Sequence, residues 1–101
     1  MHQYEQDTVT ELYMLQLLPE RMDCFVRYGE TVHRYFEELE GYGGLEMLIL
    51  SGTELLVLIK WQTCRLFDMY LPQILNAVPV KAWLAQGQLL WHRPSLTRQL
   101  T

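Results

Sequence analysis

The sequence has 101 residues, of which 50% are hydrophobic and 20% are charged, a composition typical of one compact globular domain. Its formal net charge of -4 argues against the clusters of Lys and Arg that neutralise nucleic-acid phosphates, so we expect no nucleic-acid partner. The longest apolar run, Leu55–Ile59, is far shorter than the roughly 20 residues of a membrane-spanning helix. The first residues lack the basic start and apolar stretch of a signal peptide, so we expect no membrane association and a cytoplasmic location.

A first strand is predicted over Thr8–Leu17, where β-branched, aromatic and aliphatic residues are mixed in a short run. Pro19 suits the first turn of a helix, because its φ is already helical and its missing N–H would have no partner there. Apolar residues then recur at helical spacing, which predicts a helix from Pro19 to about Leu39. The segment Gly41-Tyr42-Gly43-Gly44 ends this helix, since glycine adopts positive φ without a Cβ clash.

Two apolar runs, Leu45–Leu50 and Glu54–Gln62, are joined by a short glycine-containing connection and predict a β-hairpin. Thr63 can cap the helix that follows. We expect Pro72 and Pro79 to interrupt that helix, because proline removes a helical hydrogen bond and its ring clashes with the preceding turn.

A fourth strand is predicted over Gln88–Arg93 and is expected to end before Pro94. The tail from 94 to 101 shows no readable pattern, so the core of a single domain covering residues 1–101 is expected within residues 8–93. The element order is β-α-β-β-α-β, the split βαβ arrangement of an α+β fold. Such a fold has a four-stranded antiparallel sheet with both helices on one face.

Both faces of the predicted sheet are apolar, although helices cover only one of them. In the third strand Leu55 and Val57 have one parity, whereas Leu56 and Leu58 have the other, and the sequence does not decide which parity meets the helices. An uncovered apolar face of this extent is a partner surface or an aggregation hazard. Self-association of two sheets is the simplest cover, so we expect a homodimer.

Three segments of the chain carry a family resemblance: TELYMLQL before Pro-Glu-Arg, EGYGGLEML and LLVLIKWQT. In these segments the sequence resembles the dimeric ferredoxin-like superfamily, whose members are also called dimeric α+β barrels. This superfamily includes the antibiotic biosynthesis monooxygenases and small haem-degrading enzymes, and the resemblance covers about residues 8–93. It implies a monooxygenase-like protein that binds a planar, largely apolar substrate, a quinol, polyphenol or haem, between helices and sheet. It implies no resident cofactor.

Family members of these kinds place a Trp beside an Asn and a His or Tyr in a pocket between helices and sheet. Trp61 of this chain matches the family Trp and is therefore implied to shape the pocket. The accompanying Asn has no counterpart, because Val57 is apolar and the only Asn of the chain is Asn76.

His33 is the candidate catalytic base or ligand, with Trp61 as the second catalytic candidate. His33 falls on the sheet-facing stripe of the first predicted helix, one turn after Gly29, whose missing side chain leaves a gap. A gap, an imidazole and a nearby Trp would form a small pocket with one titratable group. The alternative is a satisfied core or edge histidine beside a close helix–sheet contact.

Gly29 and four aromatic residues are the candidates for binding the substrate; the aromatic residues are Tyr13, Tyr35, Phe36 and Tyr70. Core packing is the alternative for each aromatic residue. His92 could bind an anionic ligand, but a surface strand position is the alternative. The three histidines show no spacing typical of a metal site, and two cysteines 40 residues apart suggest neither a redox motif nor a zinc site. The sequence leaves two functions open: an enzyme acting on a small aromatic ligand, or a non-catalytic dimeric module that binds a ligand or partner.

Overall fold

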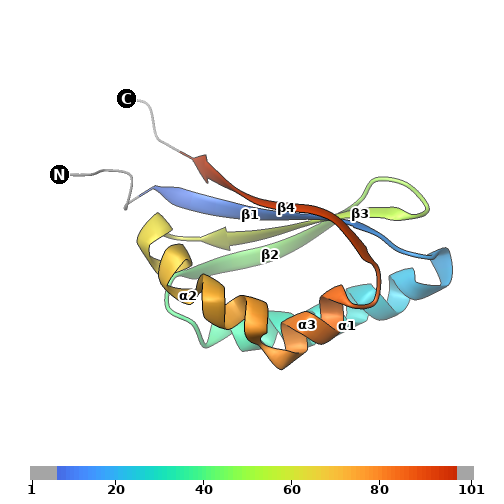
Figure 1. The fold of residues 1–101 in the computed structure, drawn as a ribbon, viewed down its shortest axis with the longest axis horizontal. Helices are drawn as coiled ribbons and strands as arrows, with labels where there is room; N and C mark the ends of the chain where they lie inside the picture. The colour runs from blue at the N-terminus through green and yellow to red at the C-terminus, as the bar shows by residue number, and fades with distance from the viewer. Residues whose placement is uncertain (1–6, 98–101) are drawn as a thin grey trace.

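The computed structural model describes residues 7–97, and the side chains among them up to residue 95. Four strands form one antiparallel sheet in the order β2-β3-β1-β4, and the helices lie against one face of it (Figure 1). The strands are β1 (Thr8–Gln16), β2 (Tyr42–Ile49), β3 (Glu54–Trp61) and β4 (Gln88–Thr97). The helices are η2 (Pro19–Arg21, a 3-10 turn), α1 (Met22–Glu37), α2 (Cys64–Asn76) and α3 (Val78–Leu84). This ferredoxin-like α+β arrangement confirms the predicted fold class.

The register of the sheet decides which side chains meet the helices. Tyr13 in β1 lies opposite Val57 of β3 on one side and opposite His92 of β4 on the other. The odd-numbered positions of β1 and β3 are buried, whereas Leu56 and Leu58 point to the opposite face and are only half-buried. The helices therefore cover the odd parity of these two strands, which the sequence alone left undecided.

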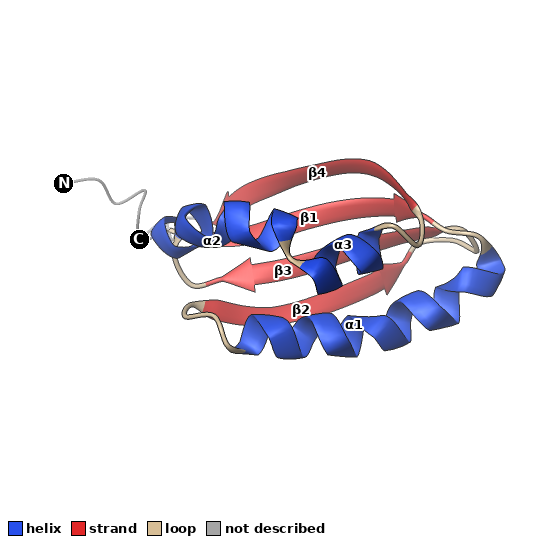
Figure 2. Cartoon of the chain, turned by 60° about the horizontal axis from the view of Figure 1, so that its bottom comes forward, coloured by secondary structure: helices blue, strands red, loops and turns tan. Residues whose placement is uncertain are grey.

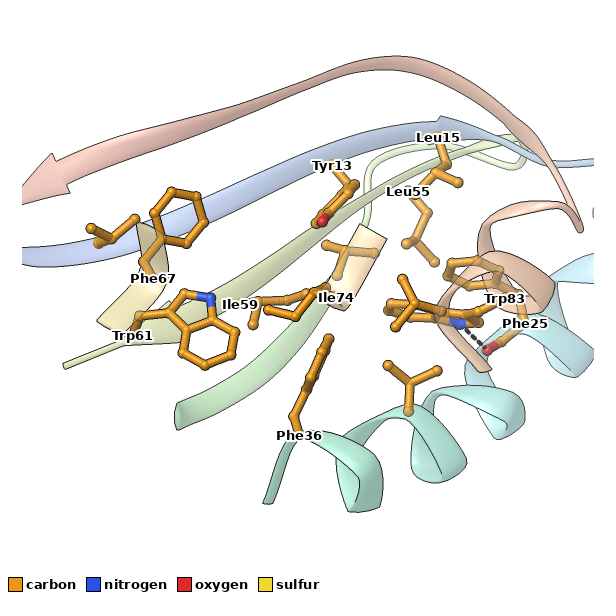
Figure 3. Close-up of a cluster of buried hydrophobic side chains, with 14 of the residues drawn as sticks. Tyr13, Leu15, Phe25, Phe36, Leu55, Ile59, Trp61, Phe67, Ile74 and Trp83 are labelled. Atoms are coloured by element: carbon orange, nitrogen blue, oxygen red, sulfur yellow. Dashed lines mark hydrogen bonds between the residues drawn. The ribbon is translucent and has the colours of Figure 1, made fainter. Parts of the chain in front are cut away.

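The core fills the space between the sheet and the helices. Figure 2 shows α1 running along β2, while α2 and α3 lie over the middle of the sheet. Trp83 stacks on Phe25 with ring centroids 4.7 Å apart, and its indole Nε1 donates to the Phe25 carbonyl oxygen at 3.0 Å (Figure 3). This contact joins α3 to α1. Large buried side chains occupy the rest of the interface, among them Leu15, Phe36, Leu55, Ile59, Trp61 and Ile74.

The helical predictions need two corrections. The helix predicted from Pro19 begins as a 3-10 turn and becomes α-helical at Met22. Pro72 does not interrupt α2, which continues through it to Asn76, and the break comes at Ala77 instead. Pro79 lies in the first turn of α3, where a missing N–H costs no helical hydrogen bond. Thr63 caps α2 as predicted, since its hydroxyl accepts from the Leu66 backbone N–H at 3.2 Å.

The strand predictions also need two corrections. β2 begins at Tyr42 rather than Leu45, because the glycines predicted to form a turn continue the strand with an irregular register. β4 runs through Pro94 to Thr97, so the expected end at Arg93 is wrong. Pro94 lies opposite Glu11 in an edge strand, where its missing N–H need not have a sheet partner. The tail beyond 97 lies outside the described residues.

Candidate functional site

Glu11 is fully buried on the helix-facing side of β1. Its carboxylate accepts hydrogen bonds from three side chains: the Tyr13 hydroxyl, Trp61 Nε1 at 3.2 Å and His92 Nε2 at 2.8 Å. These four residues are called the buried polar cluster below. A carboxylate is expensive to remove from water unless its oxygens are hydrogen-bonded or paired with charge, and the three donors meet this requirement.

The pleat of three adjacent strands brings the buried polar cluster together. Tyr13 and His92 are direct cross-strand neighbours, and their rings stack with centroids 4.0 Å apart and planes 7° from parallel. Trp61 lies opposite Val9, two residues before Glu11 on the same face of β1, so its indole can reach the carboxylate. The cluster therefore ties the centre of the sheet to both neighbouring strands.

The hydrogen bonds define how protons are held in this cluster. Burial and the adjacent charge of Glu11 raise the pKa of Tyr13 above its usual range, so its phenol stays protonated and acts as a donor. When His92 donates Nε2–H to Glu11, its Nδ1 is the ring nitrogen that can accept a proton. The His92 side chain is 20% exposed, whereas Glu11 is 0% exposed, so the imidazole is where the cluster reaches solvent.

His33 belongs to a second group, on the other side of the domain. Its Nδ1 lies 2.6 Å from the Tyr42 hydroxyl oxygen, and its Nε2 lies 3.4 Å from Glu37 Oε2. A hollow of about 370 Å³, called the α1–β2 hollow below, is lined by Val26, Gly29, Glu30, His33, Leu45 and Met47. Its lining is mostly apolar, with the His33 imidazole as a titratable group.

Gly29 allows a close approach between α1 and β2. A Cβ at this position would lie 2.5 Å from the terminal methyl of Met47 and 3.7 Å from Trp83. The gap predicted above Gly29 is thus occupied by Met47, and the α1–β2 hollow lies beside it.

The structure links His33 to Trp61 through a third residue. The Tyr42 ring lies 5.5 Å from the His33 ring and 5.9 Å from the Trp61 ring, measured between centroids. The rings of Phe36 and Tyr70 also lie against the Trp61 ring, with centroid distances of 5.8 Å and 6.3 Å.

The last predicted substrate-binding residue, Tyr35, accepts a hydrogen bond from Gln73 Nε2 at 3.3 Å and packs against Phe36. The predicted site residues therefore fall into three places. Tyr13 belongs to the buried polar cluster, Gly29 and His33 line the α1–β2 hollow, and the other aromatic residues lie around or near Trp61.

Solved structures of other proteins share the fold of this chain. No family model matches the chain, and no curated protein matches it either. A mutant of SnoaB, a cofactor-independent oxygenase from Streptomyces nogalater, superimposes with a TM-score of 0.74 and 17% identity over 93% of this chain and 96% of that one. A proposed antibiotic biosynthesis monooxygenase from Bordetella bronchiseptica does so with a TM-score of 0.66 and 13% identity over 95% and 100%. A second such protein, from Nitrosomonas europaea, gives 0.67 and 11% over 99% and 96%.

This chain has the fold of the antibiotic biosynthesis monooxygenase-like proteins. The likeness confirms the fold that the sequence resemblance implied. A fold shared at such low identity does not carry chemistry with it, so the activity has to be argued from this chain's own side chains.

Sequence reasoning missed two residues of the site. Glu11 stands on the same stripe as Val9, Tyr13 and Leu15, and it is the only charged residue there. A single charge among apolar residues on the buried face of a strand indicates a candidate site residue. The sequence alone does not show which face of β1 is buried, so this signal could be used only with the structure. Tyr42 was assigned to a turn, although it begins β2 beside His33.

The arrangement around Glu11 is suited to moving a proton. A buried carboxylate fixes the tautomer of a neighbouring imidazole and stabilises the imidazolium that forms when the ring accepts a proton. Within residues 7–97 no group of three His, Cys, Asp or Glu side chains is arranged to hold a metal ion. No helix in the described part of the chain is both long and apolar enough to cross a membrane.

Proposed function

We propose that this protein is a monooxygenase-like enzyme that acts on a planar, largely apolar quinol or polyphenol and needs no resident cofactor. The observation that carries the proposal is the fully buried Glu11 carboxylate, held by three donors and paired with a histidine that reaches solvent at the sheet edge. Ion pairs buried in a core are often no more stabilising than apolar side chains of the same volume. A role in chemistry gives a reason for keeping one here.

In the proposed reaction His92 Nδ1 takes a proton from a substrate hydroxyl, and Glu11 stabilises the resulting imidazolium. The deprotonated substrate is electron-rich enough to reduce O₂ directly, so the electrons come from the substrate itself. One oxygen atom then enters the substrate and the other leaves as water. Trp61 Nε1 holds the second carboxylate oxygen, which keeps Glu11 directed at the imidazole.

The substrate is proposed to approach from the β4 edge, where His92 is the exposed member of the cluster. His33, which lines the α1–β2 hollow with Gly29, is the other proposed base, as the sequence suggested. The two histidines lie in separate groups with separate hydrogen-bond partners. Single substitutions therefore distinguish the two sites.

Oxygen uptake tests this function. We expect the protein to accelerate O₂ consumption by 1,4-dihydroxynaphthalene or quercetin above the rate of the uncatalysed reaction. Loss of a general base typically lowers a rate by about 10²–10⁴-fold, so His92→Asn is expected to lose about that much while His33→Ala does not. The reverse pattern would move the site to the α1–β2 hollow. Absence of uptake with both compounds, together with an unchanged haem spectrum on titration, would reject the enzyme.

Self-association through the uncovered side of the sheet is also proposed. The helices leave one face of the sheet uncovered (Figure 1). The register places six apolar side chains on that face, and they define the open sheet face: Leu12, Met14, Leu48, Leu56, Leu58 and Trp91. Leu48 is 47% exposed and Trp91 is 36% exposed in the single chain. A second copy of the same chain would cover this face with a surface of the same kind, which supports a homodimer.

A non-catalytic dimeric module that binds a ligand or partner is the second candidate. It is favoured by the dense packing between helices and sheet, where Phe36, Trp61, Ile74 and Trp83 are fully buried (Figure 3). Saturable binding of quercetin without oxygen uptake would support the module over the enzyme.

A further inference from the structure

Tyr42 lies between the surface group around His33 and the buried aromatic core. Its hydroxyl oxygen is 2.6 Å from His33 Nδ1, a short distance for a hydrogen bond between these groups. On the far side of the imidazole, Nε2 faces the carboxylate of Glu37 at 3.4 Å. A carboxylate at Nε2 favours the tautomer with the proton on that nitrogen, so Nδ1 is the acceptor and the phenol is the donor.

The ring of Tyr42 makes a second contact, with the interior. It meets the Trp61 ring edge-on at a centroid distance of 5.9 Å, and Phe36 packs against both rings. Trp61 is fully buried, and its Nε1 donates to Glu11. Indole and phenol rings at this separation are in van der Waals contact, where an electron passes between them readily.

We propose that Tyr42 and His33 form a redox-active pair that removes one-electron oxidising equivalents from Trp61. When a one-electron oxidant has converted Trp61 to its radical cation, Tyr42 donates an electron to Trp61. At the same time the phenolic proton of Tyr42 moves to His33 Nδ1. The products are neutral Trp61, a neutral tyrosyl radical at Tyr42 and an imidazolium at His33. Glu37 stabilises that imidazolium.

The oxidant is an oxygen-derived radical if the protein works as proposed above. The pair itself does not depend on that reaction, because any one-electron oxidant of tryptophan starts the same transfer. It would remove oxidising equivalents from the buried polar cluster, to which Trp61 belongs, by carrying them to the half-exposed edge at β2.

The proton acceptor distinguishes Tyr42 from the other tyrosine beside Trp61. The Tyr70 and Trp61 ring centroids lie 6.3 Å apart, but among the side chains of residues 7–95 the Tyr70 hydroxyl has no hydrogen-bond partner. Burial, followed by the charges of Glu37 and Glu30, raises the pKa of Tyr42 to about 12, so the phenol is protonated at neutral pH. Its oxidation at neutral pH therefore requires a nearby base, which His33 supplies.

Flash photolysis with tris(bipyridine)ruthenium(II) and persulfate tests the pair in the full chain without any substrate. A Trp91→Phe background is used, because Trp91 is exposed and would compete for the oxidant. We expect a tyrosyl radical in the electron paramagnetic resonance spectrum, with the g-value of a radical that accepts a hydrogen bond. Tyr42→Phe should lower its yield at least fivefold, whereas the matched control Tyr70→Phe should leave it unchanged.

His33→Ala supplies an independent arm that does not alter the tyrosine. It should lower the radical yield and abolish the hydrogen-bond signature, and added imidazole should restore both through the open α1–β2 hollow. Equal yields in Tyr42→Phe and the background protein would overturn the proposal, as would a radical unaffected by His33→Ala. The photolysis experiment does not measure oxygen uptake. A result that overturns the redox pair would therefore not argue against the proposed enzyme activity.

Discussion

Replacing Glu11 by alanine would remove the acceptor shared by three buried or half-buried donors. The Trp61 N–H is fixed inside the core and cannot find another acceptor, and a buried group left in this way costs about 1–3 kcal/mol. Tyr13 is nearly as buried and is expected to add a similar cost, whereas His92 can turn toward solvent. We expect Glu11→Ala to lower the free energy of unfolding by roughly 3–5 kcal/mol, the range measured when one partner of a buried pair is removed.

Glu11→Gln separates charge from hydrogen bonding. The glutamine amide keeps an oxygen for Trp61 Nε1, while its NH₂ can donate to the Tyr13 hydroxyl and to a His92 that has changed tautomer. We expect this variant to lose about 1–2 kcal/mol, since the hydrogen bonds remain but no longer involve a charge.

Urea denaturation at one fixed protein concentration measures these losses, because association with a second copy would make the midpoint depend on concentration. Glu46→Gln is the matched control. Glu46 pairs with Lys60 at 2.9 Å on the exposed side of the sheet, and such surface pairs contribute about 0–1 kcal/mol. The reasoning is refuted if Glu11→Ala destabilises the protein no more than Glu46→Gln.

Three further predictions concern the packing, the ionisation and the open face of the sheet. Gly29→Ala should stay within about 1 kcal/mol of the parent in urea denaturation, because the flexible end of Met47 can move and alanine favours the helix. Gly87→Ala should lower the free energy of unfolding by about 1–3 kcal/mol, since its Cβ would lie 2.8 Å from a backbone oxygen. Equal losses in Gly29→Ala and Gly87→Ala would contradict the packing argument. Stability should fall as the pH rises from about 10 through about 12, because the unfolded chain releases phenolic protons that folded Tyr42 retains. Urea midpoints against pH should show a smaller fall in Tyr42→Phe, and identical profiles would speak against the raised pKa. Leu58→Lys should sediment as a monomer at a concentration where the parent is a dimer, and an unchanged sedimentation coefficient would count against the open sheet face as the interface.

Local signals in the sequence were enough to predict the order of the elements. Pro19 marked the start of the first helical segment, and the Ser51-Gly52-Thr53 connection marked the hairpin between β2 and β3. Each of these depends on the conformational preferences of the residues themselves, so tertiary contacts were not needed to read them.

The boundaries at the sheet edges could not be predicted in the same way. Pro94 normally ends a strand, but β4 continues through it because β4 is an edge strand. The glycines after Tyr42 normally form a turn, but they continue β2, which is the other edge strand. In both cases the outcome depends on the position of the strand in the sheet, which one sequence does not reveal.

The candidate site was only partly predictable for a related reason. Both parities of β1 are apolar, so the charge of Glu11 could equally have pointed to solvent. His92 and Trp61 are distant from Glu11 in the sequence, and only the register of β1 with β3 and β4 brings them to one carboxylate. Trp61 was predicted as a site residue through the family resemblance, whereas Glu11 became a candidate only with the structure.

Proton transfer to His92 is most directly tested by mixing 1,4-dihydroxynaphthalene with the protein under argon, where no oxidation follows. The account predicts that the bound quinol shows the absorption of its phenolate at neutral pH, and that this spectrum is lost in His92→Asn while binding persists. A bound quinol that stays protonated in the parent protein, or a phenolate that forms equally well without His92, would contradict it.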